Sequence, residues 1–205
     1  MAGQWAFFFN SDACSGCKTC QVACKDKNNL PQGVHWRKVT EVTGGKWELK
    51  NGLWQSSVAA YNVSMACCHC QNPPCLPACP TKSIWKREDG IVFLDETNCT
   101  RCRLCETVCP YGAIRYDAVS MIMTKCDFCA DELAQGLAPV CVSACPNRAL
   151  DFGDLDGLKK KYGEGARVFP LPDPAEPKPA LILKPHRQAE FVGTHNPEIA
   201  NWAEI

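Results

Sequence analysis

The sequence predicts an α+β fold in which small modules are organised around metal centres. Cysteine accounts for 17 of the 205 residues, a proportion at which chains are usually held together by disulfides or metal rather than by apolar burial alone. Sixteen of these cysteines fall into four groups of four. Short alternating apolar runs, bounded by turn residues, lie between the groups and indicate small β-hairpins.

Charge and hydropathy exclude two classes of partner. The 22 Lys and Arg residues balance 22 Asp and Glu residues, so the basic surface expected of a nucleic-acid-binding protein is missing. The longest apolar runs are about five residues, against the roughly twenty that cross a bilayer. No basic segment followed by an apolar one stands at the N-terminus, so we expect neither a membrane span nor an export signal.

The four cysteine quartets repeat one spacing with variations. The first and third quartets share the spacing x2, x2, x3, whereas the second and fourth keep the opening x2 and the closing x3 around a longer middle interval. Proline follows the last cysteine of the second, third and fourth quartets. The quartets are Cys14, Cys17, Cys20 and Cys24; Cys67, Cys70, Cys75 and Cys79; Cys99, Cys102, Cys105 and Cys109; and Cys126, Cys129, Cys141 and Cys145.

This spacing is typical of 4Fe–4S clusters. In bacterial ferredoxins, three thiolates of one run and the fourth of another complete each cubane. Structural zinc usually takes two separated C-x2-C knuckles, which only the fourth quartet resembles. Covalent haem needs a His directly after C-x-x-C, and none is present. The seventeenth cysteine, Cys68, is expected to be a buried free thiol, with an alternative ligand role left open.

The first half of the chain predicts a strand, a helix and a β insertion. Residues 4–9 are apolar and aromatic, as in a short strand that enters the first quartet, and residues 17–27 contain neither Gly nor Pro, which suits a short helix. Residues 31–66 alternate apolar and polar side chains around Asn51-Gly52. Asn-Gly between alternating runs is the strongest short hairpin signal.

A second hairpin is predicted between quartets two and three, over residues 83–95 around Asp89-Gly90. A quartet, a hairpin and another quartet form a complete two-cluster ferredoxin module, so these two quartets are expected to share their clusters. Quartets one and four would then pair. The third and fourth quartets are also close enough in sequence to pair, and the spacing leaves this choice open.

The C-terminal part changes character after a last helix. Residues 155–162 carry three lysines near their end, at 159–161, with Gly163 just beyond, as expected where cations oppose the helix dipole. Six prolines between Pro170 and Pro185 predict an extended segment. Its apolar residues 180–183 need cover, either as an arm lying along another subunit or within a flexible tail.

No catalytic residue is expected in this chain. It has no nucleophile motif and no glycine-rich dinucleotide fingerprint, and its four histidines lack catalytic companions. His69, inside the second quartet, is expected to face solvent or bond to the backbone rather than bind iron. Several clusters in one small chain predict a relay of single electrons, with the chemistry carried by a partner's cofactor.

Nearly the whole chain resembles a known family. The residues that carry the resemblance are Gly-Cys-Lys-Thr-Cys at 16–20, Ala-Cys-Lys-Asp at 23–26, Lys-Arg-Glu-Asp-Gly at 86–90, Cys-Pro-Tyr-Gly-Ala at 109–113, Thr-Lys-Cys at 124–126 and Arg-Ala-Leu-Asp-Phe-Gly at 148–153. With the four quartets, they are similar to the four-cluster iron–sulfur subunits of molybdopterin oxidoreductases, nearest to those of dimethyl sulfoxide reductases.

The resemblance implies four 4Fe–4S clusters and a pairing of quartets one with four and two with three. The ligand sets that it implies are Cys14, Cys17, Cys20 and Cys145; Cys24, Cys126, Cys129 and Cys141; Cys67, Cys70, Cys75 and Cys109; and Cys79, Cys99, Cys102 and Cys105. The expected layout is one ferredoxin-like module from 1–30 and 110–160, a β insertion over 31–66, a second module over 67–109, and an extended C-terminal arm over 161–205.

The same resemblance implies an electron-transfer subunit of an anaerobic respiratory reductase. Electrons would pass between an integral membrane quinone-linked subunit and a molybdenum or tungsten bis-pterin catalytic subunit. The complex would be peripheral to the cytoplasmic membrane, on the cytoplasmic side if no signal acts or on the periplasmic side if the partner carries the chain out. The alternative is a soluble polyferredoxin shuttle, which the neutral charge and the Pro-rich arm disfavour.

Overall fold

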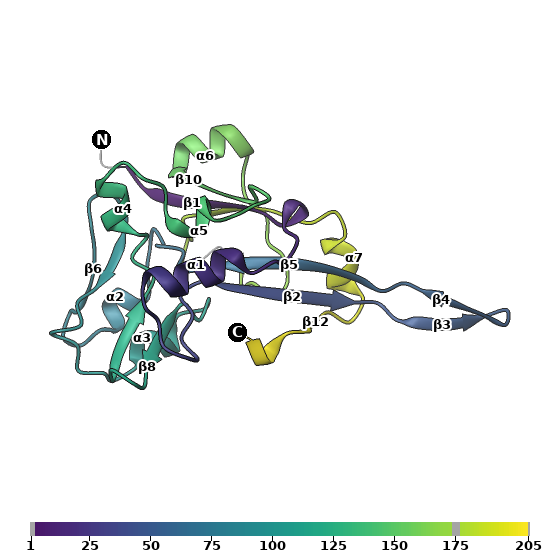
Figure 1. Cartoon of the computed structure of the whole chain (residues 1–205), viewed down its shortest axis with the longest axis horizontal. Helices are drawn as coiled ribbons and strands as arrows, with labels where there is room; N and C mark the ends of the chain where they lie inside the picture. Colours follow the sequence, from purple (N-terminus) through teal and green to yellow (C-terminus); the bar gives the residue numbers. More distant parts are fainter. Residues whose placement is uncertain (1–2, 174–176, 205) are drawn as a thin grey trace.

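Small sheets and short helices make up the computed structural model, which describes residues 3–173 and 177–204. In these residues two three-stranded sheets and three two-stranded hairpins are connected by loops and short helices that carry the cysteines. The molecule is elongated, with one hairpin projecting far from the rest (Figure 1). The predicted α+β class is confirmed, and the arrangement is one of small sheets without a dominant sheet.

The first sheet is centred on the N-terminal strand. β1 (Trp5–Asn10) lies between β10 (Leu150–Asp154), to which it is antiparallel, and β11 (Leu181–Lys184), to which it is parallel. Alternate residues of a strand face opposite sides, so Phe7 and Phe9 enter one core while Ala6 and Phe8 enter another. β1 is thus buried on both faces.

Helix α6 (Leu155–Tyr162) covers the Phe8 side of this sheet. Asp154 is its N-cap: the carboxylate accepts hydrogen bonds from the backbone N–H groups of Asp156 and Gly157. Tyr162 stacks on Phe8 with ring centroids 3.6 Å apart. The helix predicted over 155–162 is confirmed.

The second sheet contains the inner part of the β insertion. β2 (Lys38–Gly44) pairs antiparallel with β5 (Ala59–Met65), and the short β12 (Glu198–Ile199) pairs with the other edge of β2. Helix α7 (Ala189–Thr194) packs against both β2 and β5. The C-terminal residues therefore help to cover this insertion.

The insertion continues outward as a second hairpin, β3 (Trp47–Lys50) and β4 (Leu53–Ser56). Asn51 and Gly52 form its turn, with φ of 52° and 76°, as a type I′ turn requires. The hairpin predicted at this Asn-Gly is confirmed. Figure 1 shows it extending from the body of the molecule. All of its strand residues except Glu48 are exposed, so both of its faces are open to solvent.

Two further hairpins and two short helices form a separate core. β6 (Ile84–Lys86) pairs with β7 (Val92–Leu94), which confirms the hairpin predicted around Asp89-Gly90, and β8 (Ile114–Asp117) pairs with β9 (Ile122–Lys125). The accompanying helices are α2 (Cys75–Ala78) and α3 (Leu104–Val108). Ile84, Ile114 and Met123 are buried together with Cys75 and Cys105.

The remaining helices flank the first and fourth quartets. α1 (Thr19–Lys27), which the sequence predicts, packs on α5 (Val140–Ser143), and α4 (Ala130–Ala134) precedes α5. Single 3₁₀ turns occupy Ser11–Ala13 and Trp202–Glu204. None of the helices in the described part of the chain has the length and apolar character needed to cross a bilayer.

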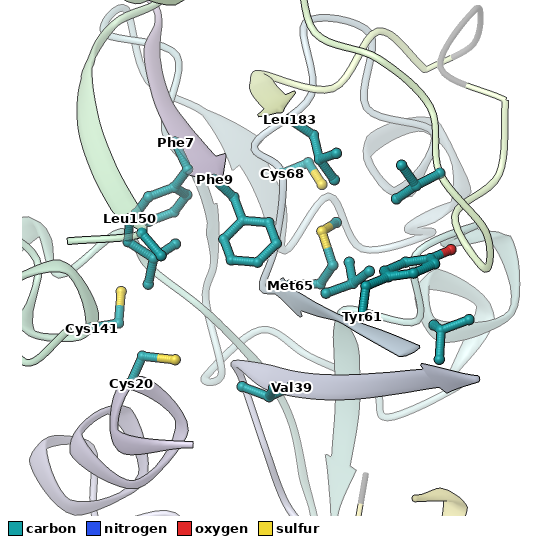
Figure 2. Close-up of a cluster of buried hydrophobic side chains, with 14 of the residues drawn as sticks. Phe7, Phe9, Cys20, Val39, Tyr61, Met65, Cys68, Cys141, Leu150 and Leu183 are labelled. Carbon is teal, nitrogen blue, oxygen red and sulfur yellow. The ribbon is translucent and has the colours of Figure 1, made fainter. Parts of the chain in front are cut away.

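The main core lies between the two three-stranded sheets. Figure 2 shows Phe7 and Phe9 of β1 facing Val39 of β2 and Tyr61 and Met65 of β5. The sulfur atoms of Cys20 and Cys141 lie at one side of this core, and that of Cys68 lies beside Leu183. The apolar core therefore directly borders the cysteine loops.

The Pro-rich segment packs on its own chain. Ala180, Ile182 and Leu183 are 1–3% exposed because β11 pairs with β1, so the idea that another subunit covers residues 180–183 is wrong. Backbone N–H groups of Gln71 and Asn72 donate to the carbonyls of Lys178 and Pro177, which ties the segment to the second quartet. Within the ranges predicted for the modules and the arm, residues 1–2, 174–176 and 205 lie outside the described residues.

Candidate metal centres

Each quartet opens with the same backbone turn. The residue before the second cysteine has a positive φ in all four: 72° at Gly16, 41° at His69, 62° at Arg101 and 64° at Phe128. Successive N–H groups in such turns form a concavity for negative charge. The backbone N–H groups of Arg101 and Phe128 each lie 3.4 Å from the sulfur of the first cysteine of their quartet.

The three Cys-Pro segments also share one conformation. In each, the third residue after the cysteine has a positive φ, and the next backbone N–H donates to the cysteine sulfur. The positive-φ residues are Lys82, Gly112 and Arg148. The bonds run from Ser83 to Cys79 at 3.2 Å, from Ala113 to Cys109 at 3.4 Å, and from Ala149 to Cys145 at 3.3 Å. An N–H aimed at sulfur stabilises a thiolate.

Site I is the group formed by the first three cysteines of quartet one and the last of quartet four. Cys14, Cys17, Cys20 and Cys145 line one pocket, closed on its inner side by Phe9 and Leu150. Cys17 lies at the exposed rim. Burial raises the pKa of Cys14 to about 11, and the neighbouring thiols of Cys20 and Cys145 act in the same direction.

Site II is the group of Cys24 with the first three cysteines of quartet four: Cys126, Cys129 and Cys141. All four are buried. Cys24 comes from α1, Cys141 from α5, and the other two from the loop between β9 and α4. Burial raises the pKa of Cys24 to about 12, and Cys141 and Cys129 contribute to that rise. Burial also raises the pKa of Cys126, with Cys24 and Cys141 acting in the same direction, so the four cysteines are neighbours.

Site III is formed by Cys67, Cys70 and Cys75 with Cys109 of quartet three. These thiols, together with Cys68, line a pocket whose other walls include Val92 and Ile114. Burial raises the pKa of both Cys70 and Cys75 to about 12, and Cys67 and Cys109 add to the effect at both.

Site IV is the group of Cys79 with the first three cysteines of quartet three. Cys79, Cys99, Cys102 and Cys105 line a third pocket, backed by Ile84 and Met123. Cys102 is exposed at its rim. Burial raises the pKa of Cys105 to about 11, with the thiols of Cys99, Cys102 and Cys79 acting in the same direction.

The four sites follow one another in a series. The thiol of Cys20 in site I interacts with that of Cys141 in site II, and Cys126 of site II interacts with Cys67 of site III. Helix α2 begins at Cys75 of site III and is capped by Cys79 of site IV. Among the described cysteines, exposed thiols occur only in the two end sites, at Cys17 and Cys102.

The donor sets suit clusters better than single ions. Within the described residues, no three His, Cys, Asp or Glu side chains converge on a point that could hold one metal ion. Sites I and IV instead place four thiols around a pocket, and site III places its four quartet thiols and Cys68 around one. Four thiolates spaced around a volume, with N–H groups directed at sulfur, are what a cubane of iron and sulfide requires.

Cys68 and His69 are both buried beside site III. Burial raises the pKa of the Cys68 thiol well above its usual value, in keeping with the buried free thiol expected from the sequence. His69 is 0% exposed, and its Nδ1 accepts the Val92 N–H at 3.0 Å. The backbone-bonded imidazole is confirmed, and the solvent-facing alternative is wrong. Burial holds the pKa of His69 well below its usual value.

Two buried cations near the sites were missed by sequence reasoning. Lys125 is 4% exposed and donates to the carbonyls of Val92 and Cys126. Arg37 is 2% exposed and precedes β2. Burial opposes the charged form of Arg37, but the negative charge of the cysteines of sites I and II in their thiolate form raises its pKa. Neither residue lies in a sequence motif or spacing that predicts a buried cation.

Comparison with known proteins identifies the family. Residues 58–155 match the family described as 4Fe-4S dicluster domain, which confirms the predicted cofactor. The chain is 45% identical to the B subunit of the anaerobic dimethyl sulfoxide reductase of Escherichia coli (strain K12) over 205 residues, the full length of both proteins.

Relatives from other reductases are more distant. The B subunit of the polysulfide reductase of Wolinella succinogenes is 35% identical over 193 residues, which cover 92% of this chain and 97% of the relative. Thiosulfate reductase electron transfer subunit PhsB of Salmonella typhi is 36% identical over 157 residues, 76% of this chain and 79% of the relative. The chain therefore belongs to the family of iron–sulfur electron-transfer subunits of the dimethyl sulfoxide, polysulfide and thiosulfate reductases.

Proposed function

We propose that the chain relays single electrons through four 4Fe–4S clusters, one at each of sites I to IV. The observation that carries this proposal is the grouping of the sixteen quartet cysteines into four sets of four, arranged in series with an exposed thiol at each end. The clusters supply one-electron redox chemistry when bound. The chain's own residues provide the thiolates, direct N–H groups at sulfur and exclude water from sites II and III.

The proposed ligands are the four sets that line or form the sites. Site I would use Cys14, Cys17, Cys20 and Cys145; site II, Cys24, Cys126, Cys129 and Cys141; site III, Cys67, Cys70, Cys75 and Cys109; and site IV, Cys79, Cys99, Cys102 and Cys105. Cys68 also lines the pocket of site III, but we leave it outside these sets because it does not belong to the repeated quartet spacing and its sulfur lies beside Leu183.

Two ferredoxin-like modules would hold these sites in pairs. Residues 1–30 and 110–160 form one module with sites I and II, supported by the packing of α1 on α5. Residues 67–109 form most of the other, with sites III and IV, supported by a separate core that contains Cys75, Cys79, Cys99 and Cys105. Because Ile114 of β8 and Met123 of β9 belong to the same core, the hairpin β8–β9 packs with this second module, beyond the predicted boundary at 109. The insertion at 31–66 and the C-terminal segment at 161–205 complete the chain.

The partners would be a molybdenum or tungsten bis-pterin catalytic subunit and a quinone-linked membrane subunit. The relatives' names place them in reductases of small sulfur compounds. Because Cys17 and Cys102 are exposed at opposite ends of the series, each end offers one point of electron exchange with a partner. The complex would be peripheral to the cytoplasmic membrane.

Isolation of the chain from its native cells tests this assignment. An affinity-tagged chain should co-purify with a larger subunit that contains one molybdenum or tungsten and two pterins for each tagged chain. Recovery of a four-cluster chain with neither metal nor pterin would instead support a soluble polyferredoxin shuttle. Omitting detergent is the matched control, since it should remove only a membrane subunit.

A further inference from the structure

Arg37 is a buried cation whose hydrogen bonds are incomplete. Its Nη1 lies 3.4 Å from the carbonyl oxygen and 3.2 Å from Oγ of Ser64. Its Nε and Nη2 are buried and have no hydrogen-bond partner. Among the described residues no carboxylate forms a salt bridge with it.

Such a group needs a compensating negative charge. An unpaired charge in a low-dielectric interior is strongly destabilising. The guanidinium lies 4.8 Å from the centre of the Phe7 ring. This cation–π contact covers one face of the guanidinium plane but provides no hydrogen-bond acceptor for its N–H groups. The uncharged surroundings therefore leave the cation uncompensated.

The negative charge is available from cysteine thiolates of two different sites. Arg37 interacts electrostatically with Cys20 of site I and with Cys24, Cys126 and Cys141 of site II. Ser64 Oγ connects it to site I, because the same hydroxyl that lies 3.2 Å from Nη1 lies 3.4 Å from the sulfur of Cys20. Arg37 is thus placed between two neighbouring sites in the series.

We propose that Arg37 is a tuning residue that raises the reduction potentials of the clusters at sites I and II. The inference rests on the proposed function, which puts a cluster at each site. A cubane with four thiolates is an anion, and it gains one further negative charge when it accepts one electron. A fixed cation nearby stabilises that reduced form, and N–H groups directed at sulfur act in the same direction. Arg37 keeps its charge throughout, so it takes up no proton with the electron.

Arg101 provides a matched comparison within the same chain. It belongs to the loop of site IV, where its backbone N–H lies 3.4 Å from the sulfur of Cys99. Its side chain is exposed to solvent, where water and salt screen the charge. Replacing the Arg101 side chain should therefore change a cluster potential much less than replacing Arg37.

The test is a redox titration of the assembled complex followed by electron paramagnetic resonance, with signals assigned through Cys→Ser variants at each site. Arg37→Met should lower the equilibrium constant for one-electron reduction at sites I and II by tenfold or more, which is about 59 mV. Sites III and IV should keep their potentials. Arg37→Lys should keep the potentials at sites I and II near their wild-type values. Arg101→Met should change the equilibrium constant for one-electron reduction at site IV by less than tenfold.

Two results would overturn the inference. One is an Arg37→Met complex that holds all four clusters with wild-type potentials, or with the same shift at every site. The other is an Arg37→Lys shift as large as that of Arg37→Met, since charge would then not be the cause. These outcomes differ from failure of the proposed function, in which the wild-type chain itself would hold fewer than four clusters.

A measurement on the wild-type side chain covers the case in which Arg37→Met does not assemble. Arginine labelled with ¹⁵N in the guanidino group should give a nitrogen coupling to the reduced cluster at site I or site II in pulsed electron paramagnetic resonance. The coupling should be lost in Arg37→Lys. Absence of the coupling in the labelled wild-type complex would also overturn the inference.

Discussion

At the scale of single residues, the cysteine loops depend on strained backbone positions. The residue before the second cysteine is left-handed in every quartet, yet only Gly16 adopts that conformation without steric cost. At Gly16 an added Cβ would also lie 2.6 Å from the Asn62 side chain. Phe128 instead gains from packing, because its ring is fully buried and stacks on Phe7 with centroids 4.1 Å apart.

The first prediction concerns Cys102, the exposed thiol of site IV. Cys102→Ser should remove one corner iron and leave a 3Fe–4S centre, while the other three clusters remain because their ligands lie elsewhere. The altered centre at site IV should have a different reduction potential from the original cluster. In a series of relays, a shift of about 59 mV in the potential of one centre already changes the equilibrium of one-electron transfer to it tenfold. Quinol-dependent turnover of the complex should therefore fall by about tenfold or more.

Turnover driven by a dye that reduces the catalytic subunit directly is the control for Cys102→Ser, and it should persist. Electron paramagnetic resonance should confirm the altered cluster. Unchanged quinol-dependent turnover, with that cluster loss confirmed, would show that site IV does not lie on the electron path.

At the scale of elements, β1 organises the packing because it contributes to a different core on each face. The sequence predicts this strand and the apolar character of residues 180–183, since both follow from local composition. It does not predict that they pair, because Phe9 and Leu183 are partners from opposite ends of the chain and local pattern carries no information on distant partners. The hairpins at Asn51-Gly52 and Asp89-Gly90 were predictable because their turns are local.

The second prediction compares two leucines in different environments. Leu183→Ala removes a side chain that is 3% exposed, and the resulting cavity should destabilise the holoprotein by about 2–5 kcal/mol. Leu53→Ala, at the tip of the projecting hairpin, removes one that is 69% exposed and should change stability by about 0.5 kcal/mol or less. The measurement is cluster retention on heating, followed by visible absorbance. Equal loss in both variants would contradict the packing of β11 against β1.

At the scale of the whole molecule, the sites form a series that crosses from one core to the other. The quartets and their cofactor could be predicted because a cubane fixes the spacing of its thiolates. The pairing of quartets stayed open on spacing alone and entered only through the family resemblance. Arg37 and Lys125 could not be predicted, since a buried cation is identified by what surrounds it after folding, and its neighbours come from distant parts of the chain.

The most direct test of the four-cluster relay is the iron and acid-labile sulfide content of the chain purified without oxygen. Four cubanes predict about sixteen irons and about sixteen sulfides per chain, together with broad visible absorption that bleaches on reduction. Both counts should fall by about four when every ligand of one site is replaced by serine. About eight irons with zinc at the remaining cysteines would contradict the account, because only two of the four sites would then carry electrons.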